Sequence, residues 1–545
     1  MDQLGERKAR GAFFTPAPIA RFISSWAIQT PSDTVLEPSC GEAAFLLAAA
    51  SRLSLLGSRL NEAHQLNGVE LHDRSASAAR KLLGNLGAKA SITLGDFFLI
   101  EPDQQFDAVI GNPPFIRYQE FSGQVRAKSL EAALSQGVRL SGLASSWAAF
   151  TVHATRFLKS EGRLGLVLPA ELLTVGYAAE VRRFLLKRFG RVRLVLFEQR
   201  VFPDVLEDTI LLLAEGTGGA SHFEVYQAKT AADLEQLTIH GWTDHEPDAS
   251  DKWTRALIDA SSYDAFVSAT GTANIGCLSE WGGAYLGAVT GNNSFFCLSA
   301  KDVAAHKLAP EDVAFISPPG ARHLKGLTFT KAAWQSLVED DKRAYLFCPR
   351  GHPSAAGMRY IEAGEAASVD EAYKCKVRSP WWRVPLTRRP DFLITYMNND
   401  RLRFVRNEAD VDILNSVYGF RLSELIQPQA QRHLPIALLN SVTMLSAELS
   451  GRVHGGGMLK HEPRQLGKLV TPSVACVLNA SVKLEGLAPQ IGRLLRKNGL
   501  REALRLVDEV ILIETAGLNR KAVECIAAAR ERLLARRLAL GESIA

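Results

Sequence analysis

A short apolar strand that ends in a rigid, proline-rich turn constrains the fold of this chain more than any other stretch. Residues 106–118 read FDAVIGNPPFIRY, and the apolar run Ala108–Ile110 has the length and flanking residues of a buried parallel strand. Gly111 and the two prolines after Asn112 end the strand, because proline has no N–H to donate. Ligands of open α/β sheets bind at the carboxyl ends of the strands. The stretch therefore predicts a ligand site at residues 111–115 of an α/β sheet.

The residues of this turn suit an amino group as their ligand. Asn112 offers a side-chain carbonyl, Pro113 offers a backbone carbonyl, and Phe115 offers a flat apolar face. Two hydrogen-bond acceptors beside an aromatic plane fit the exocyclic amino group of a planar base. The alternative is a proline-rich turn closed by a core phenylalanine, and the tetrapeptide alone does not separate the two.

Composition restricts the class of protein further. At 545 residues the chain is too long for one hydrophobic core, so we expect two or three domains. Its hydrophobic content of 47% and charged content of 22% are ordinary for a globular protein, and no apolar run resembles a membrane span or a signal peptide. The 7 cysteines are scattered without any CxxC pair, which favours reduced thiols in the cytoplasm and predicts no metal site.

Upstream of the turn, the chain carries a helix and a strand–turn–helix unit. Thr15-Pro16 precedes apolar residues at helical spacing. The strand over residues 34–37 then turns through Ser39, Cys40 and Gly41 into a helix over 43–56. Small residues admit a ligand close to the backbone, and the free N–H groups of a helix start favour an anionic group. The alternative is a common strand–helix turn.

The next two strands each end on a carboxylate. Glu70 follows the strand over 66–69, where an acidic residue is placed to bind ribose hydroxyls. Asp96 follows the strand over 90–94 and is placed to accept from an adenine amino group, with Phe97 against the ring. For each carboxylate alone, a solvated strand end is the alternative.

Five short motifs thus follow one another: TP at 15–16, EPSCG at 37–41, GVEL at 68–71, GDFF at 95–98 and NPPF at 112–115. In this order they resemble the motifs of γ-class, Taq-like adenine-N6 DNA methyltransferases, which use S-adenosyl-L-methionine (AdoMet). The resemblance implies an α/β fold: a Rossmann-like AdoMet methyltransferase sheet, mostly parallel with an antiparallel last strand, followed by a mixed α+β DNA-recognition domain. EPSCG lacks the second glycine of the common GxG form, a departure typical of the γ class.

The resemblance also implies roles for individual residues. The catalytic turn would comprise Asn112, Pro113, Pro114 and Phe115, with Phe202 of a VFP segment as a second aromatic group against the extruded base. For Phe202 an ordinary core residue is the alternative. The residues implied around the cofactor are Thr15, Glu37, Ser39, Cys40 and Gly41 at the methionine end, Glu70 on the ribose, Asp96 and Phe97 at the adenine, and Pro114 of the catalytic turn.

The following segment is expected to complete the sheet. Residues 119–142 are polar without a clear period and form either a substrate lid or a plain surface loop. The elements expected next are a helix over 145–159, a strand over 163–169, a helix over 178–189, a strand over 192–197 and an antiparallel partner strand over 209–213. The alternation of strands and helices stops at 216–221, which predicts a domain boundary near residue 220.

Basic and aromatic residues concentrate in the region expected to read DNA. Residues 374–406 hold nine cations and two aspartates, so this segment carries +7 against +5 for the whole chain. Such a patch is typical of nucleic-acid binding, and a solvated basic face is the alternative. The predicted DNA-binding residues of this basic segment are Lys374, Lys376, Arg378, Trp381, Trp382, Arg383, Arg388, Arg389, Arg401, Arg403 and Arg406.

Three further segments belong to the expected recognition part. Residues 281–298 (WGGAYLGAVTGNNSFFCL) favour a Gly/Asn-rich hairpin. Residues 452–464 (RVHGGGMLKHEPR) carry a glycine triplet flanked by cations, so Arg452 and Lys460 are predicted to approach the DNA backbone. Residues 484–540 read as helices that pack on the recognition domain. The expected domains are therefore a catalytic domain over 1–220, a recognition domain over 221–480 and a helical tail over 481–545.

These observations together predict a site-specific adenine-N6 methyltransferase acting on double-stranded DNA. It would protect DNA from a separate cognate restriction endonuclease, in the prokaryotic cytoplasm and at the nucleoid. The target adenine would be flipped out of the duplex, because a paired base cannot reach the site. The alternatives are an amino-group methyltransferase acting on RNA or protein, which the long basic segment disfavours, and a non-catalytic DNA-binding subunit on the same scaffold, which the complete motifs disfavour. A fused N-terminal nuclease is not expected, because the first motif begins within the opening residues.

Overall fold

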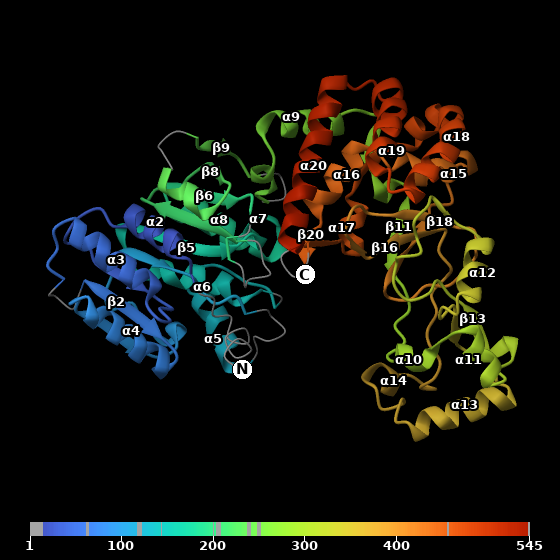
Figure 1. The fold of residues 1–545 in the computed structure, drawn as a ribbon, viewed down its shortest axis with the longest axis horizontal. Coiled ribbons are helices and arrows are strands. Elements are labelled where there is room, and N and C mark those ends of the chain that lie inside the picture. The colour runs from blue at the N-terminus through green and yellow to red at the C-terminus, as the bar shows by residue number, and fades with distance from the viewer. Residues whose placement is uncertain are drawn as a thin grey trace. The chain divides into compact units, whose positions relative to one another are not determined.

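The chain forms two compact units (Figure 1). The computed structural model describes residues 15–60, 65–116, 123–142, 144–199, 201–202, 209–236, 241–247, 252–454 and 457–542. The first unit comprises residues 1–259 with 454–456 and 536–545, and the second comprises 260–453 and 457–535. No helix among the described residues has the length and apolar character needed to cross a membrane.

A nine-stranded sheet in the order β3-β2-β1-β4-β5-β7-β6-β8-β9 is the centre of the first unit. Its strands are β1 (Val35–Glu37), β2 (Leu66–Glu70), β3 (Ala90–Leu94), β4 (Phe106–Gly111), β5 (Leu158–Pro169), β6 (Arg191–Phe197), β7 (Thr209–Glu215), β8 (Phe223–Ala228) and β9 (Thr243–His245). The five neighbouring strands β3, β2, β1, β4 and β5 pair in parallel, whereas β7 runs antiparallel to both β5 and β6. The mostly parallel sheet with an antiparallel strand near its end is therefore confirmed.

Two hydrophobic clusters lie on opposite faces of this sheet. On β4, Val109 belongs to one cluster, whereas Ala108 and Ile110 belong to the other, because successive side chains of a strand point to opposite faces. The first cluster includes residues of α6 (Ser146–Ala154) and α8 (Ala179–Arg188). The helices that supply the second are α2 (Ala17–Ala27), α3 (Ala44–Leu55) and α4 (Asp73–Asn85). Burial on both faces explains why Ala108–Ile110 is continuously apolar.

The structure differs from the sequence-based expectation at two places in this unit. The sheet does not end near residue 220, because β8 pairs with β6 and β9 pairs with β8, so that the first unit extends to Asp259. The segment expected to be a loop over 119–142 contains α5 (Gly123–Leu134), and its residues 119–122 lie outside the described part of the chain. Small residues Ser129, Ala132 and Ala133 form the buried side of α5, a pattern too weakly amphipathic to be recognised from the sequence.

The second unit is mixed α+β, as expected. A five-stranded sheet has the order β11-β19-β16-β18-β14, and three-stranded sheets have the orders β12-β15-β13 and β17-β21-β20. Their strands are β11 (Gly282–Leu286), β12 (Cys297–Leu298), β13 (Val313–Phe315), β14 (Thr328–Phe329), β15 (Tyr345–Phe347), β16 (Phe392–Thr395), β17 (Met397–Asn398), β18 (Phe404–Asn407), β19 (Val417–Leu422), β20 (Arg452–His454) and β21 (Met458–Lys460). A further pair joins β10 (Ile275–Cys277) to β22 (Val470–Pro472). The helices include α9 (Ala260–Thr270), α10 (Asn293–Phe296), α11 (Ala300–Ala305), α12 (Lys331–Glu339), α13 (Ala355–Ala366), α14 (Tyr373–Lys376), α15 (Pro428–Ala437), α16 (Ser441–Ser450), α17 (Pro463–Gly467), α18 (Val474–Arg496), α19 (Leu500–Val507) and α20 (Arg520–Glu542).

The expected hairpin over residues 281–298 is wrong. β11 pairs with β19 and β12 pairs with β15, so both strands find partners far away in the sequence. Between them Asn292 begins α10, where its side chain accepts hydrogen bonds from the backbone N–H groups of Ser294 and Phe295. The asparagine that suggested a hairpin turn is therefore a helix cap. The expected start of a helical tail at residue 481 also differs, since it falls inside α18, which packs against α15.

A buried carboxyl group lies among the C-terminal helices. Asp508, 6% exposed, begins a π-helical segment (Asp508–Thr515) and accepts hydrogen bonds from the N–H (2.7 Å) and the hydroxyl (2.6 Å) of Ser441 at the start of α16. Burial raises the pKa of Asp508 to about 7. Because the folded state holds this proton more tightly than the unfolded state, the stabilisation is complete at low pH and is lost as pH rises towards the folded pKa.

Asp508→Asn should therefore flatten the pH dependence of stability. The amide keeps the shape and one acceptor but cannot ionise. The free energy of unfolding of the second unit should therefore decrease less between about pH 4 and pH 7 than it does in the unchanged protein. Each pKa unit corresponds to about 1.4 kcal/mol. Denaturant unfolding followed across this range measures the effect, with the exposed Asp340→Asn as the matched control. An Asp508→Asn profile as steep as that of the unchanged protein would contradict the assignment.

Candidate functional site

The candidate site lies where the strands β2, β1 and β4 end. These strands are adjacent and parallel, so the turns after Glu37, Glu70 and Gly111 meet at one edge of the sheet. This edge carries the residues singled out from the sequence, and each can be placed by its contacts.

The side-chain amide of Asn112 is held at one end only. Its nitrogen donates to the Oγ1 of Thr15 at 3.3 Å, whereas its carbonyl oxygen Oδ1 is buried and has no hydrogen-bond partner among the described residues. Thr15, 4% exposed, therefore contacts the turn that carries Asn112, beside the role predicted for it at the methionine end of a cofactor. Buried acceptors are normally satisfied in folded proteins, so this oxygen is the strongest sign of a ligand site.

Ser146 fixes the backbone of the same turn and was not recognised from the sequence. Its hydroxyl donates to the carbonyl of Pro114 and accepts from the N–H of Ile116 at 2.9 Å, and its own N–H donates to the carbonyl of Ile116 at 3.0 Å. The side chain is 1% exposed. The only sequence signal is a serine pair at a helix start, which ordinarily indicates capping.

The two aromatic residues proposed to sandwich a base have different surroundings. Phe115 is half-buried and packs against both hydrophobic clusters of the sheet. Phe202 is 2% exposed within the cluster that contains Ile110, and residues 203–208 after it lie outside the described part of the chain. This burial favours the core-residue alternative for Phe202 and argues against the expected contact with a base.

The carboxylate of Glu70 joins two turns of the site. It accepts from the N–H of Gly41 at 2.8 Å and from the N–H of His72 at 2.9 Å. Gly41 has φ +50°, and a Cβ built there would meet no heavy atom within 4 Å. The backbone at Gly41 is therefore open to a ligand, and Glu70 retains oxygen lone pairs beside it.

Glu37 and Cys40 have structural contacts that the sequence did not reveal. Glu37 is 2% exposed, and its carboxylate accepts from the N–H of Leu46 at 2.9 Å in the first turn of α3. Burial raises the pKa of Glu37 well above its usual value. The start of α3 is thus already capped, which argues against a ligand carboxylate bound by these N–H groups. The Cys40 thiol lies in the core, so of the EPSCG turn the half-buried Ser39 and the Gly41 backbone remain to contact a cofactor.

The expected aromatic contact at the third strand is also corrected. Asp96 accepts from the N–H of Phe98 at 3.0 Å and begins a short 3₁₀ turn, Phe97–Leu99. Phe97 is 5% exposed and packs on the ring of Phe150, with the centroids 4.8 Å apart. Since its ring belongs to the core, contact with a cofactor adenine is not supported, whereas Asp96 remains half-buried at the strand end.

Two models of known protein families match the chain. Residues 3–227 match the model of the N-6 DNA Methylase family, and residues 250–512 match that of the C-terminal domain of the type II methyltransferase M.Eco57I. Residues 3–227 therefore belong to the N-6 DNA methylase family. Between them the two matches cover most of both units.

Individual relatives cover nearly the whole methylase. It is 23% identical to the type II methyltransferase M.AccI of Acinetobacter calcoaceticus over 85% of this chain and 86% of that protein. It is 27% identical to the type II methyltransferase M.XamI of Xanthomonas campestris pv. amaranthicola over 87% of each. Among solved structures, its fold is similar to that of the Type IIL restriction-modification enzyme MmeI in complex with DNA, with a TM-score of 0.57, 13% identity and coverage of 95% of this chain and 75% of that chain.

Fewer cations of the basic segment are available to bind DNA than its sequence suggests. Arg401, predicted to bind DNA, is 6% exposed and donates to the carbonyl of Lys325 at 3.1 Å, and burial lowers its pKa to about 10. Arg378 donates to the carbonyls of Thr290 (2.7 Å) and Val289. Both arginines therefore hold neighbouring loops, which argues against their expected contacts with DNA.

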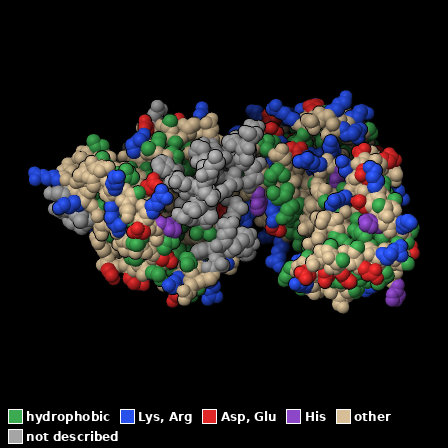
Figure 2. All heavy atoms as spheres, turned by 60° about the horizontal axis from the view of Figure 1, so that its bottom comes forward, with side chains coloured by type: hydrophobic (Ala, Val, Ile, Leu, Met, Phe, Trp, Pro, Cys, Tyr) green, Lys and Arg blue, Asp and Glu red, His purple; other side chains and the backbone are tan. Residues whose placement is uncertain are grey.

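Other members of the set are engaged by acidic or aromatic partners. Arg389 pairs with Asp410 and Asp412, Arg403 with Asp400, Arg406 with Glu408 and Lys460 with Glu462, while Trp381 donates to Glu365. Arg452 is half-buried on β20. The exposed cations of the basic segment without an ion pair among the described residues are Lys374, Lys376, Arg383 and Arg388, and the Arg383 guanidinium lies 5.4 Å from the ring centre of Trp382. On the face drawn in Figure 2, basic and acidic side chains are interspersed.

Ser146→Ala should reduce turnover more than stability. The change leaves the N–H of Ile116 and the carbonyl of Pro114 without the hydroxyl that fixes them, so the catalytic turn loses its backbone geometry. We expect at least a tenfold loss in the rate of methyl transfer, on the order of one misplaced positioning contact. The matched control is Thr151→Val, which removes a buried hydroxyl of α6 that donates to the carbonyl of Trp147 within the same helix. Equal rates for both variants in single-turnover assays would show that Ser146 does not position the turn for methyl transfer.

Proposed function

We propose that this methylase transfers a methyl group from AdoMet to N6 of an adenine at a specific DNA sequence, as a γ-class modification enzyme. The observation that carries the proposal is the buried carbonyl oxygen of Asn112, which has no partner among the described residues and lies at the carboxyl end of β4. An amino group with two N–H bonds would satisfy this oxygen and the neighbouring carbonyl of Pro113 together.

The chain's own residues then have distinct parts in the reaction. Asn112 and Pro113 accept the two N–H bonds of N6, which orients its lone pair and increases its nucleophilicity. Thr15 holds the Asn112 amide so that its oxygen faces the substrate. The half-buried ring of Phe115 offers a stacking surface for a base extruded from the duplex. No carboxylate occurs in residues 111–116, so the proton of N6 leaves after the transfer rather than to a base in the turn.

The residues that would hold AdoMet are Ser39, the Gly41 backbone, Glu70 and Asp96. The open space at Gly41 and the carboxylate of Glu70 beside it fit a ribose with two hydroxyl groups. When bound, AdoMet supplies an electrophilic methyl group. Positioning of the amino group by Asn112 and Pro113 would provide much of the rate acceleration.

Double-stranded DNA is the proposed substrate, and a separate restriction endonuclease is the proposed functional partner. Relatives that align over 85% and 87% of the chain are named as type II methyltransferases. The exposed cations Lys374, Lys376, Arg383 and Arg388 supply charge for a DNA backbone. We place the enzyme in the prokaryotic cytoplasm, at the nucleoid.

Sequencing that detects modified bases tests this function directly. DNA from a host expressing the methylase should carry N6-methyladenine at one recurring sequence, and the Asn112→Ala variant should leave that sequence unmodified. The loss should be at least about a hundredfold, because the variant removes an acceptor used in the reaction, while AdoMet affinity should stay within a few-fold. Modification of RNA or protein in the absence of DNA modification would overturn the proposal.

Glu70→Gln should weaken the binding of AdoMet rather than the binding of DNA. The amide preserves an acceptor for the turn but loses the charge-assisted bond to the ribose, worth about 1.5–3 kcal/mol, or roughly ten- to a hundredfold in affinity. Calorimetric titration with AdoMet measures this. Glu101→Gln, whose carboxylate pairs with Arg156 at 2.9 Å, is the matched control. Identical titrations for Glu70→Gln and Glu101→Gln would show that Glu70 has a structural role and does not bind AdoMet.

A further inference from the structure

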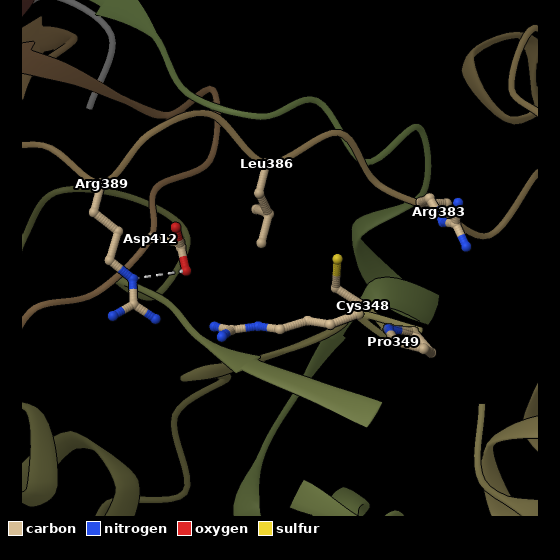
Figure 3. A pocket seen from close by; sticks show the side chains of 7 residues that line it. Cys348, Pro349, Arg383, Leu386, Arg389 and Asp412 are labelled. Carbon is tan, nitrogen blue, oxygen red and sulfur yellow. Dashed lines mark hydrogen bonds and ion pairs between the residues drawn. The ribbon is translucent and has the colours of Figure 1, made fainter. Parts of the chain in front are cut away.

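A pocket lined by arginines lies in the second unit. It has a volume of about 430 Å³, and its lining includes Cys348, Arg350, Arg383, Leu386, Arg389 and Asp412. In Figure 3 the Arg389–Asp412 pair lies on one side, Arg383 lies on the opposite side, and Cys348 and Leu386 point into the space between them. Three arginines and one aspartate thus line the pocket.

The charges of this pocket are not balanced. Arg389 is neutralised, because its Nε lies 3.3 Å from Asp412 and its Nη1 pairs with Asp410. Arg350 and Arg383 are exposed and form no ion pair with any residue in the described part of the chain. With Asp410 included, three arginines stand against two aspartates, which leaves a net charge of +1, so the pocket suits an anionic ligand.

The loop that carries Arg350 is fastened at both ends to one buried residue. The N–H of Cys348 donates to the carbonyl of Asp312 at 2.9 Å, and the N–H of Ser354 donates to the Asp312 carboxylate at 2.9 Å. Asp312 is fully buried. Since both ends of the loop are fixed, Arg350 is presented with little loss of backbone freedom on binding, which favours a binding site over a chance cluster of surface charges.

The shape of the pocket selects between the two parts of DNA that arginine recognises. Base edges lie inside a groove, so side chains that read them must protrude from the protein. Phosphates stand out from the duplex and fit into a concave site. Asp412, 5% exposed and paired with Arg389, is also not free to accept from a base.

We propose that this pocket binds one backbone phosphate of the DNA substrate through Arg350 and Arg383. This site rests on the proposed function, because it requires that DNA is the substrate. Arg383 was singled out by the basic segment, whereas Arg350 follows β15 outside it, and the fold brings the two together. The contact would orient the duplex on the methylase without reading its sequence.

The salt dependence of DNA binding tests the site. R350A/R383A should lower the slope of log affinity against log salt concentration by about 0.9, the value for one phosphate contact. Affinity for a duplex carrying the methylated sequence and for a random duplex should fall by the same factor, about tenfold or more. R350K/R383K should recover part of the loss, because a phosphate accepts a point charge.

The matched control is R493A/R496A, which removes two exposed arginines of α18 that have no ion pair among the described residues. Equal losses in both double variants would attribute the effect to net charge and overturn the site, as would an unchanged slope for R350A/R383A. A loss confined to the methylated sequence would overturn it in favour of base reading. If the unchanged methylase itself fails to bind DNA, the proposed function fails with it, whereas the other negative results leave that function standing.

Discussion

The candidate site depends on one buried acceptor, the side-chain oxygen of Asn112, which has no hydrogen-bond partner among the described residues. A buried carbonyl oxygen without a partner costs about 1–3 kcal/mol of stability, so the oxygen of Asn112 must be held in place by its surroundings. Thr15 occupies the amide nitrogen, and Ser146 fixes the backbone two and four residues further along. The structure thus keeps an unfavourable group ready for a ligand, which is the physical meaning of a preorganised site.

The elements around this acceptor were largely predictable, because local patterns determine them. Strand ends such as Glu70 and Asp96 follow short apolar runs, and the structure places them where the alternation of strands and helices requires. The surroundings of individual side chains were not predictable. Phe97 and Phe98 are neighbours in a motif, yet the ring of Phe97 lies in the core while that of Phe98 is only partly buried. Phe97 is buried because it packs against Phe150 and Phe157, which lie more than fifty residues further along the chain.

The basic segment shows the same limit for electrostatics. Nine cations against two aspartates predicted a free positive surface. The acidic partners of Arg389 and Arg406 follow the segment in sequence, however, and Arg401 is buried and donates to a backbone carbonyl. Local charge counts therefore overestimate the charge that DNA can meet. Conversely, the charge count could not identify Arg350, because its significance comes from a pocket that three separate segments of the chain form together.

The position of Thr15 shows how far the catalytic geometry depends on packing elsewhere in the unit. Thr15 precedes α2, and α2 packs directly on β5, which pairs with β4. At Gly165 of β5 a Cβ would approach the Cγ2 of Ile23 to 2.5 Å, a separation that packed atoms do not tolerate. Any larger residue there would push α2 away from the sheet, and Thr15 with it. Gly165 pairs with Ile110, which lies two residues before Asn112. Gly165 therefore allows the helix to approach closely enough for Thr15 to hold the amide of Asn112.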